Sequence, residues 1–253
     1  MTAIRFDSEH QMTVRRFGAG PEIVWIHGLG ESSASFDPIA RMIDGFTHVL
    51  PDLPGYGRSP WGYAAMGLEA QAGRLATWLG ERPPAIVIGH SMGGVLATMI
   101  AERTRVRAVI NIDGNISHAD CTFSGPAALF TAADFAHHGF PAMRDDIYRK
   151  GVDDLPLRGY HAAMCFASPA VFHRHAVDLV AMSEREDLAQ RFGALNCPSL
   201  FIAGVPDGIS AHSRLMLERH NVRWVGIEPA GHWVYLDQPE KFIAALRELF
   251  EEI

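Results

Sequence analysis

The first 113 residues alternate short apolar runs with longer segments whose apolar side chains recur at helical spacing. The short runs are mainly apolar and partly β-branched, which is typical of strands buried on both faces of a sheet. The predicted strands of this part are residues 4–7, 12–17, 23–26, 48–51, 85–88 and 106–112. The predicted helices are residues 33–43, 67–79 and 95–101. Strands 4–7 and 12–17 are expected to pair as an edge hairpin, and the strict alternation that follows predicts a parallel sheet covered by helices on both faces.

The alternation stops after residue 113 and resumes near residue 199. Residues 115–191 contain no clear strand, and they scatter aromatic and Met side chains among short helical stretches that are interrupted by Pro126, Pro141, Pro156 and Pro169. We therefore expect an α/β core formed by residues 1–114 and 192–253, with a mostly helical cap at 115–191 inserted after the sixth strand. As a set, the cap's apolar side chains favour a cover over an apolar pocket. The second half of the core is predicted to hold strands 199–204 and 222–227 and helices 212–219 and 239–251.

Composition narrows the class of protein. The chain has 253 residues, of which 48% are hydrophobic and 20% are charged, as expected for a packed globular core. The net charge of −7 and the absence of a long Lys/Arg cluster argue against a nucleic-acid partner, and mildly against an anionic membrane surface.

The cysteines and the N-terminal sequence suggest a reducing compartment. Cys121, Cys165 and Cys197 are odd in number and widely spaced, so neither a zinc site nor a disulfide framework is indicated. The first residues lack the apolar stretch of a signal peptide, and the sequence has no run of membrane-spanning length. We expect a cytoplasmic protein without a metal or cofactor; the sequence does not indicate its oligomeric state.

The candidate nucleophile is Ser91, in the sequence Gly89-His90-Ser91-Met92-Gly93-Gly94. A G-x-S-x-G sequence between a strand and a helix is typical of a sharp turn that lifts the serine hydroxyl out of the sheet. Glycines on either side remove the Cβ atoms that would collide there. His90 is expected to point away from the serine, as a packed structural side chain.

A serine hydroxyl needs a base, and the base needs an acid that orients it. Of the 13 histidines, His232 follows a late strand in a Gly-His loop, on the sheet edge where ligands bind in parallel sheets. Two aspartates, Asp207 and Asp113, also follow strands at this edge. We favour Asp207 as the acid and keep Asp113 as the alternative.

Backbone N–H groups are the candidate donors to an oxyanion. Met92 N–H begins the helix after the nucleophile. The second donor is expected in the loop His27-Gly28-Leu29-Gly30, where we choose the N–H of Leu29. One such donor contributes about 3 kcal/mol to transition-state stabilisation.

These motifs together resemble the α/β-hydrolase superfamily over nearly the whole chain. The residues that carry the resemblance are His27-Gly28-Leu29-Gly30, Asp52-Leu53-Pro54-Gly55-Tyr56-Gly57-Arg58-Ser59, Gly89-His90-Ser91-Met92-Gly93-Gly94 and Gly231-His232. A serine at the elbow, in place of the aspartate of haloalkane dehalogenases and epoxide hydrolases, is similar to the carboxylesterase branch. The resemblance implies hydrolysis of a small, largely apolar ester through an acyl-enzyme. It leaves the choice of acid open, because the acid follows either strand in this superfamily.

Two other functions fit the same motifs. A C–C bond hydrolase of a vinylogous diketone would need a basic residue under the cap to hold the substrate's carboxylate, and Arg144, Arg149, Arg158 and Arg174 lie in that segment. A non-catalytic ligand-binding protein could also use the same scaffold.

Overall fold

The computed structural model describes residues 4–62 and 66–253. Residues 1–3 and 63–65, which fall within the predicted core, lie outside the described residues. The strands are β1 (Arg5–Glu9), β2 (Met12–Gly18), β3 (Glu22–Ile26), β4 (Thr47–Asp52), β5 (Ile86–His90), β6 (Ala108–Ile112), β7 (Ser199–Pro206) and β8 (Trp224–Ala230). Within the described residues they form one eight-stranded sheet in the order β1-β2-β4-β3-β5-β6-β7-β8.

The sheet is antiparallel at one edge and parallel elsewhere. β1 and β2 form the predicted hairpin, and β2 pairs antiparallel with β4. From β4 to β8 every neighbouring pair is parallel. β3, β5 and β6 are almost completely buried, which explains why their sequences read as continuous apolar runs. The carboxyl ends of the parallel strands therefore meet at one edge, where the candidate residues were expected.

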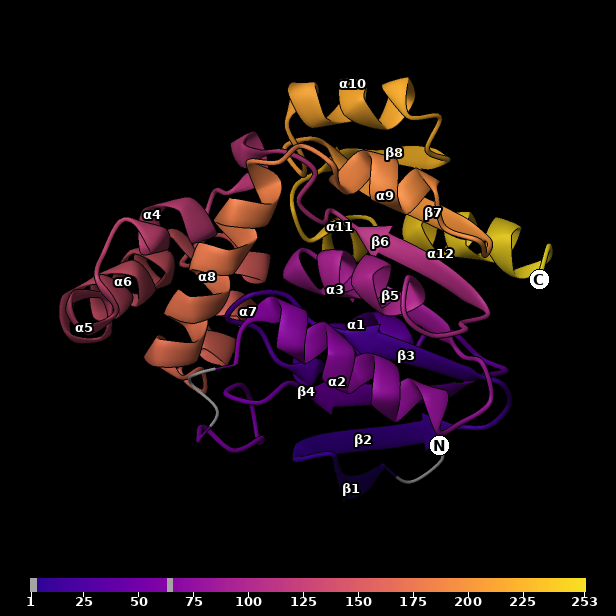
Figure 1. Ribbon diagram of the computed structural model, residues 1–253, viewed down its shortest axis with the longest axis horizontal. Helices are drawn as coiled ribbons and strands as arrows, with labels where there is room; N and C mark the ends of the chain where they lie inside the picture. The colour runs from indigo at the N-terminus through magenta and orange to yellow at the C-terminus, as the bar shows by residue number, and fades with distance from the viewer. Residues whose placement is uncertain (1–3, 63–65) are drawn as a thin grey trace.

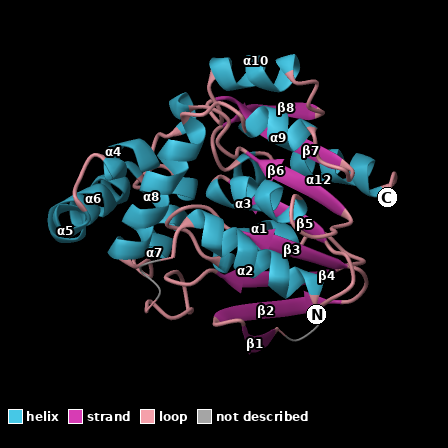
Figure 2. Ribbon diagram, viewed as in Figure 1, coloured by secondary structure: helices cyan, strands magenta, loops and turns pink. Residues whose placement is uncertain are grey.

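The helices complete the α/β fold. Before β6 they are η1 (Ser33–Phe36), α1 (Asp37–Ala40), α2 (Leu68–Gly80) and α3 (Met92–Ala101). Between β6 and β7 they are η2 (His118–Asp120), α4 (Ser124–Ala128), α5 (Ala132–Asp134), η3 (Phe135–Gly139), α6 (Phe140–Lys150), α7 (Leu155–Met164), α8 (Pro169–Ser183) and α9 (Leu188–Gly193). The last are α10 (Ala211–Arg219), α11 (Val234–Asp237) and α12 (Pro239–Phe250). Figures 1 and 2 show α2, α3 and α9 on the near face of the sheet, with α1, α11 and α12 on the far face.

Helices α4 to α8 lie together beyond one end of the strands, as Figure 1 shows. Pro156 and Pro169 lie in the first turns of α7 and α8, where a missing N–H is not needed, and Pro126 is the third residue of α4. Pro141 differs, because α6 continues directly from η3 and the chain is already helical before it. Pro156 and Pro169 therefore mark where α7 and α8 begin. Helix α9 differs from its neighbours because it packs against α3 and α10.

Residues 33–43 do not form the single helix that their periodicity predicts. Ser33–Phe36 is a 3₁₀ turn, and the α-helix covers only Asp37–Ala40. Two contacts account for this: the Asp52 carboxylate, 19 residues away along the chain, accepts the N–H of Ser33 at 2.7 Å, and Pro38 occupies the first turn of the α-helix. A side chain from β4 therefore fixes how this segment starts.

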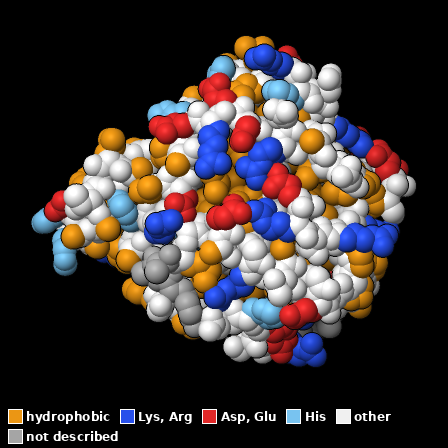
Figure 3. Space-filling view, in the orientation of Figure 1, with side chains coloured by type: hydrophobic (Ala, Val, Ile, Leu, Met, Phe, Trp, Pro, Cys, Tyr) orange, Lys and Arg blue, Asp and Glu red, His pale blue; other side chains and the backbone are white. Residues whose placement is uncertain are grey.

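Charged side chains on the face seen in Figure 3 are of both signs and lie close together near its centre. Ion pairs connect α2, the end of α3 and α9, with Arg103 paired to Glu69 and Glu102, and Arg191 to Glu102. The three cysteines are free thiols, buried at Cys121. Within the described residues, no helix has the length and apolar character needed to cross a membrane.

Candidate active site

Ser91 occupies a strained turn between β5 and α3. Its backbone has φ 54° and ψ −122°, a conformation that is costly for a residue with a side chain and that is concentrated at functional sites. A Cβ on Gly89 would lie 2.0 Å from the Gly93 oxygen, and one on Gly93 would lie 2.0 Å from the Ile26 oxygen. The chain can therefore pass from strand to helix here only if both positions are glycine.

The first backbone N–H groups of α3 come before the helix's own hydrogen bonds begin. The first N–H groups that bond back to the Ser91 oxygen belong to Gly94 and Val95, so those of Met92 and Gly93 precede the hydrogen-bonded turns of α3. Leu29 follows β3 and lines the same cavity as Ser91. Of the two predicted oxyanion residues, Leu29 therefore shares a cavity with Ser91, and Met92 follows Ser91 directly along the chain.

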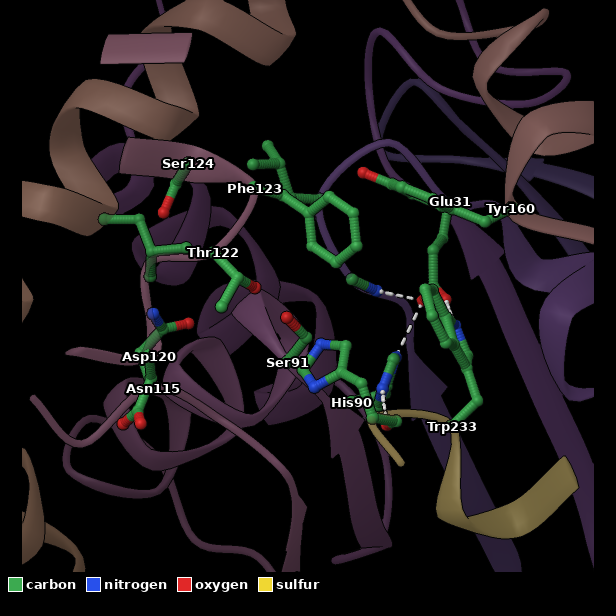
Figure 4. Close-up of a pocket in the computed structure, with 14 residues that line it drawn as sticks. Glu31, His90, Ser91, Asn115, Asp120, Thr122, Phe123, Ser124, Tyr160 and Trp233 are labelled. Carbon is green, nitrogen blue, oxygen red and sulfur yellow. Dashed lines mark hydrogen bonds and ion pairs between the residues drawn. The ribbon is translucent and has the colours of Figure 1, made fainter. Parts of the chain in front are cut away.

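Ser91 and His232 line one small cavity, shown in Figure 4. Burial is the main cause that lowers the pKa of the His232 ring to about 3, and a positive charge at His90 acts in the same direction. The ring is consequently neutral at physiological pH and able to accept a proton. The cavity's volume is about 20 Å³, close to that of a single water site.

Aromatic side chains crowd the cavity. The Phe123 ring lies 5.0 Å from the Tyr160 ring and 6.2 Å from the His232 ring, between centroids. Tyr160 also reaches the loop of Leu29, because a Cβ on Gly30 would lie 2.9 Å from its hydroxyl. Two larger clefts adjoin this wall, one of about 640 Å³ that shares Tyr160 and Trp233 with the cavity, and one of about 680 Å³ that shares Phe123.

The two candidate acids differ in their surroundings. Asp113 is 1% exposed, has a positive φ of 46°, and accepts the Gly204 N–H at 3.0 Å. A Cβ on Gly208 would lie 2.5 Å from its carboxylate, and the backbone of Gly208 hydrogen-bonds the His232 ring. Asp207 is exposed and does not line the cavity. Residues 204–208, which are the end of β7 and the turn after it, thus contact Asp113 through Gly204 and His232 through Gly208.

Two carboxylates in the cavity wall were not anticipated from the sequence. Asp120 accepts hydrogen bonds from the N–H of Ser210 and the hydroxyl of Ser213, so it holds η2 to the start of α10. The sequence does carry a signal for Asp120, because Ser117 three residues earlier forms a capping box with it. Glu31 is 2% exposed, and nothing in its sequence neighbourhood indicates a buried position.

His90 lies inside the site. Its ring is buried and lines the cavity, 4.7 Å from the His232 ring between centroids. The predicted packing of His90 agrees with its burial. The prediction did not include its place in the wall of the cavity that holds Ser91. Figure 4 shows it bonded to Glu31 on one side.

Comparison with known proteins identifies the class. Residues 23–245 match the alpha/beta hydrolase family, so the chain belongs to that family. Among curated relatives, a pimeloyl-[acyl-carrier protein] methyl ester esterase of Klebsiella pneumoniae is 40% identical over 103 residues, which are 39% of this chain and 38% of that protein. The chain thus spans under two fifths of that relative in the match. The esterase of the same name from Aeromonas hydrophila is 26% identical over 92% of this chain and 96% of its own length.

Solved structures agree on the fold. A thermophilic esterase from Thermogutta terrifontis superposes with a TM-score of 0.77 at 24% identity, covering 95% of this chain and 94% of its own. E-2-(acetamidomethylene)succinate hydrolase gives a TM-score of 0.75 at 22% identity, covering 99% and 100%.

Proposed function

We propose that this protein is a serine carboxylesterase that cleaves a small, largely apolar ester through an acyl-enzyme. The observation that carries the proposal is the strained Ser91 turn in the same cavity as His232, a buried ring whose pKa of about 3 keeps it neutral. The names of the relatives, methyl ester esterases and a thermophilic esterase, support ester hydrolysis.

The proposed reaction is acyl transfer in two halves. His232 takes the hydroxyl proton as the Ser91 oxygen bonds to the ester carbonyl carbon, and the N–H groups of Leu29 and Met92 hold the oxyanion. The carbon–oxygen bond to the alcohol then breaks, and the alcohol leaves with the proton from His232. Water, deprotonated by His232, attacks the acyl-enzyme and releases the acid and the free Ser91 hydroxyl.

For the acid, the sequence favoured Asp207 with Asp113 as the alternative, whereas burial supports Asp113, so in this proposal Asp113 comes first and Asp207 becomes the alternative. Asp113 contacts residues 204–208, whose Gly208 bonds to His232, and burial raises the pKa of Asp113 well above the usual value. Burial disfavours the ionised form of such a carboxyl, and a nearby imidazolium would offset that cost, so the proposed pairing would stabilise the charged form of His232. Asp207 would have to turn inward from its exposed position to serve the same role.

The walls support an apolar substrate. The cavity at Ser91 has little free space, whereas the adjoining clefts of about 640 and 680 Å³ are lined largely by apolar side chains, including Phe166 and Leu155 in the first and Met143 and Phe130 in the second. A small shift of Phe123 or Tyr160 would open the cavity to one of them.

The arginines that a C–C bond hydrolase would need have other surroundings. Arg149 pairs with Asp146, Arg174 pairs with Asp178, and Arg158 donates to the Gly151 carbonyl. Among the described residues that line the Ser91 cavity, none is Arg144, Arg149, Arg158 or Arg174. The ester function is therefore the one that the site favours.

Initial rates on p-nitrophenyl acetate, butyrate and octanoate test the proposal, with wild type compared with Ser91→Ala, Asp113→Asn and Asp207→Asn. We expect Ser91→Ala to abolish turnover and Asp113→Asn to reduce kcat by about 10³-fold or more. If Asp207→Asn loses its esterase activity while Asp113→Asn keeps it, the acid is Asp207. A wild type that binds a fluorophosphonate at Ser91 but cleaves no ester would refute the substrate class. A wild type that does neither would leave a ligand-binding protein.

A further inference from the structure

Glu31 is a buried carboxylate in the cavity wall that the proposed reaction does not use. Its Oε2 accepts the N–H of Gly28 at 2.7 Å and lies 3.0 Å from Nδ1 of His90, and its Oε1 accepts the indole N–H of Trp233 at 2.6 Å (Figure 4). These partners belong to three separate parts of the site. Gly28 precedes the oxyanion residue Leu29, His90 precedes the nucleophile, and Trp233 follows the base.

The hydrogen bonds of His90 define its protonation. Its Nε2 lies 2.8 Å from the carbonyl oxygen of His232, which can only accept, so Nε2 carries a proton. Its Nδ1 faces a carboxylate oxygen that already accepts the Gly28 N–H. A bare Nδ1 lone pair would repel that oxygen, so one further proton must lie between Nδ1 and Glu31.

The surroundings of Glu31 decide where that proton sits. Burial acts to raise the pKa of the carboxyl, but the charge and hydrogen bond of His90, together with the N–H groups of Trp233 and Gly28, outweigh it and hold the pKa at about 2. The N–H groups of Gly28 and Trp233 point at this carboxylate whichever atom holds the proton, and two such donors favour its ionised form. The proton therefore belongs to the imidazole.

We propose that Glu31 and His90 form a buried carboxylate–imidazolium pair that positions the three loops of the site. Glu31 folds back onto Gly28 and fixes the peptide that leads to Leu29, while His90 holds the backbone of His232 through its second nitrogen. Both are positioning residues, since neither touches the reacting atoms. The catalytic part of this inference rests on the proposed function, whereas the protonation state of His90 does not.

The pair also places a positive charge beside the base. The His90 and His232 rings lie 4.7 Å apart between centroids, and the Glu31 carboxylate lies on the far side of His90. The titratable and aromatic groups around His90 are Glu31 and His27 from the loop after β3, His232 and Trp233 from the loop after β8, and Tyr235 from α11. Of the two charges, that of His90 affects the pKa of His232 more and lowers it, while that of Glu31 raises it. Loss of the pair should consequently raise the pKa of His232.

The protonation state can be measured without any turnover. We would record ring ¹⁵N spectra of the full-length protein and assign His90 by comparison with His90→Gln. We expect two protonated ring nitrogens for His90 in wild type at about pH 7.5, and a neutral ring in Glu31→Gln. A neutral His90 ring in wild type would overturn the charged pair, whatever the enzyme's substrate proves to be.

Kinetics then separate positioning from a merely structural role. In Glu31→Gln we expect kcat to fall about 10- to 100-fold with KM changed by less than about threefold, and the acid limb of kcat/KM to move to higher pH. His90→Gln can keep an amide N–H donor to the His232 carbonyl in place of Nε2. We therefore expect it to lose less kcat than Glu31→Gln and to show the same shift of the acid limb of kcat/KM to higher pH. The double variant should be no worse than Glu31→Gln alone.

Glu102→Gln is the matched control, since this carboxylate pairs with Arg191 outside the site and should leave kcat and the pH profile unchanged. Thermal unfolding of each variant shows whether it is folded at the assay temperature. An unchanged pH profile in Glu31→Gln, or effects that simply add in the double variant, would refute the positioning role. A wild type that cleaves no ester would count against the proposed function and leave the ¹⁵N result standing.

Discussion

Two buried neutral imidazoles predict that the fold loses stability in mild acid. Burial lowers the pKa of His175 and of His232 to about 3. In the unfolded chain both rings titrate near 6.5, about the value of a free histidine. Above that pH the two rings are neutral in both the native and the unfolded state, so they do not change the free energy of unfolding. As the pH falls from 6.5 towards 3, the unfolded chain gains protons that the native protein does not, and the free energy of unfolding decreases.

The size of the effect follows from linkage. Each proton taken up only by the unfolded state costs about 1.4 kcal/mol per pH unit. Between about pH 6.5 and pH 5 one such ring therefore costs about 2 kcal/mol, and the two together cost about 4 kcal/mol. Because a typical domain is stable by about 5–15 kcal/mol, this is a large share.

Urea unfolding at about pH 7.5 and pH 5 measures the loss in wild type and in His175→Gln. His175 is 1% exposed, and its Nδ1 lies 2.9 Å from the Tyr56 hydroxyl, so a buried amide can keep that bond without titrating. We expect wild type to lose about 2 kcal/mol more than His175→Gln across this interval, whatever the stability of the variant at the higher pH. His137→Gln, at an exposed position, is the control and should lose as much as wild type. Equal losses in wild type and His175→Gln would refute the assignment of a neutral buried ring at 175.

Three further outcomes are expected. Gly93→Ala should lower the stability by about 1–3 kcal/mol and greatly slow fluorophosphonate labelling of Ser91, because the new Cβ would start 2.0 Å from the Ile26 oxygen; normal labelling of a folded variant would contradict this. The kcat/KM profile of wild type should stay level down to about pH 5, since the pKa of His232 lies near 3, and an acid limb centred near pH 6.5 would contradict a buried neutral base. Phe123→Ala should raise the ratio of octanoate to acetate hydrolysis, because the Phe123 ring separates the Ser91 cavity from a cleft of about 680 Å³; an unchanged ratio would place the acyl chain elsewhere.

The sequence predicts the sheet well because a strand that is buried on both faces is apolar at nearly every position, which can be recognised from the strand's own residues. The runs at β5 and β6 are apolar at nearly every position, and G-x-S-x-G marks the turn between strand and helix by its own steric needs. Residues 33–43 show the limit of periodicity. Their spacing suits a helix, but the start of the segment is fixed by the side chain of Asp52, which is distant in sequence. The choice between Asp113 and Asp207 has the same limit, because both follow strands at one edge and only the packed loop makes one buried and the other exposed.

Glu31 shows why part of the site could not be read from the chain. It stands in a loop of glycines and serines, where a charged residue is usually solvated, and no spacing within that loop marks it. Its three hydrogen-bond partners lie 3, 59 and 202 positions away along the chain, so the parallel sheet must assemble before they meet. The charge on its neighbour His90 depends in turn on a carbonyl 142 positions away. Local patterns can place a nucleophile and a base on one edge, but the contacts that would orient them and set the pKa of the base arise only from the packed fold.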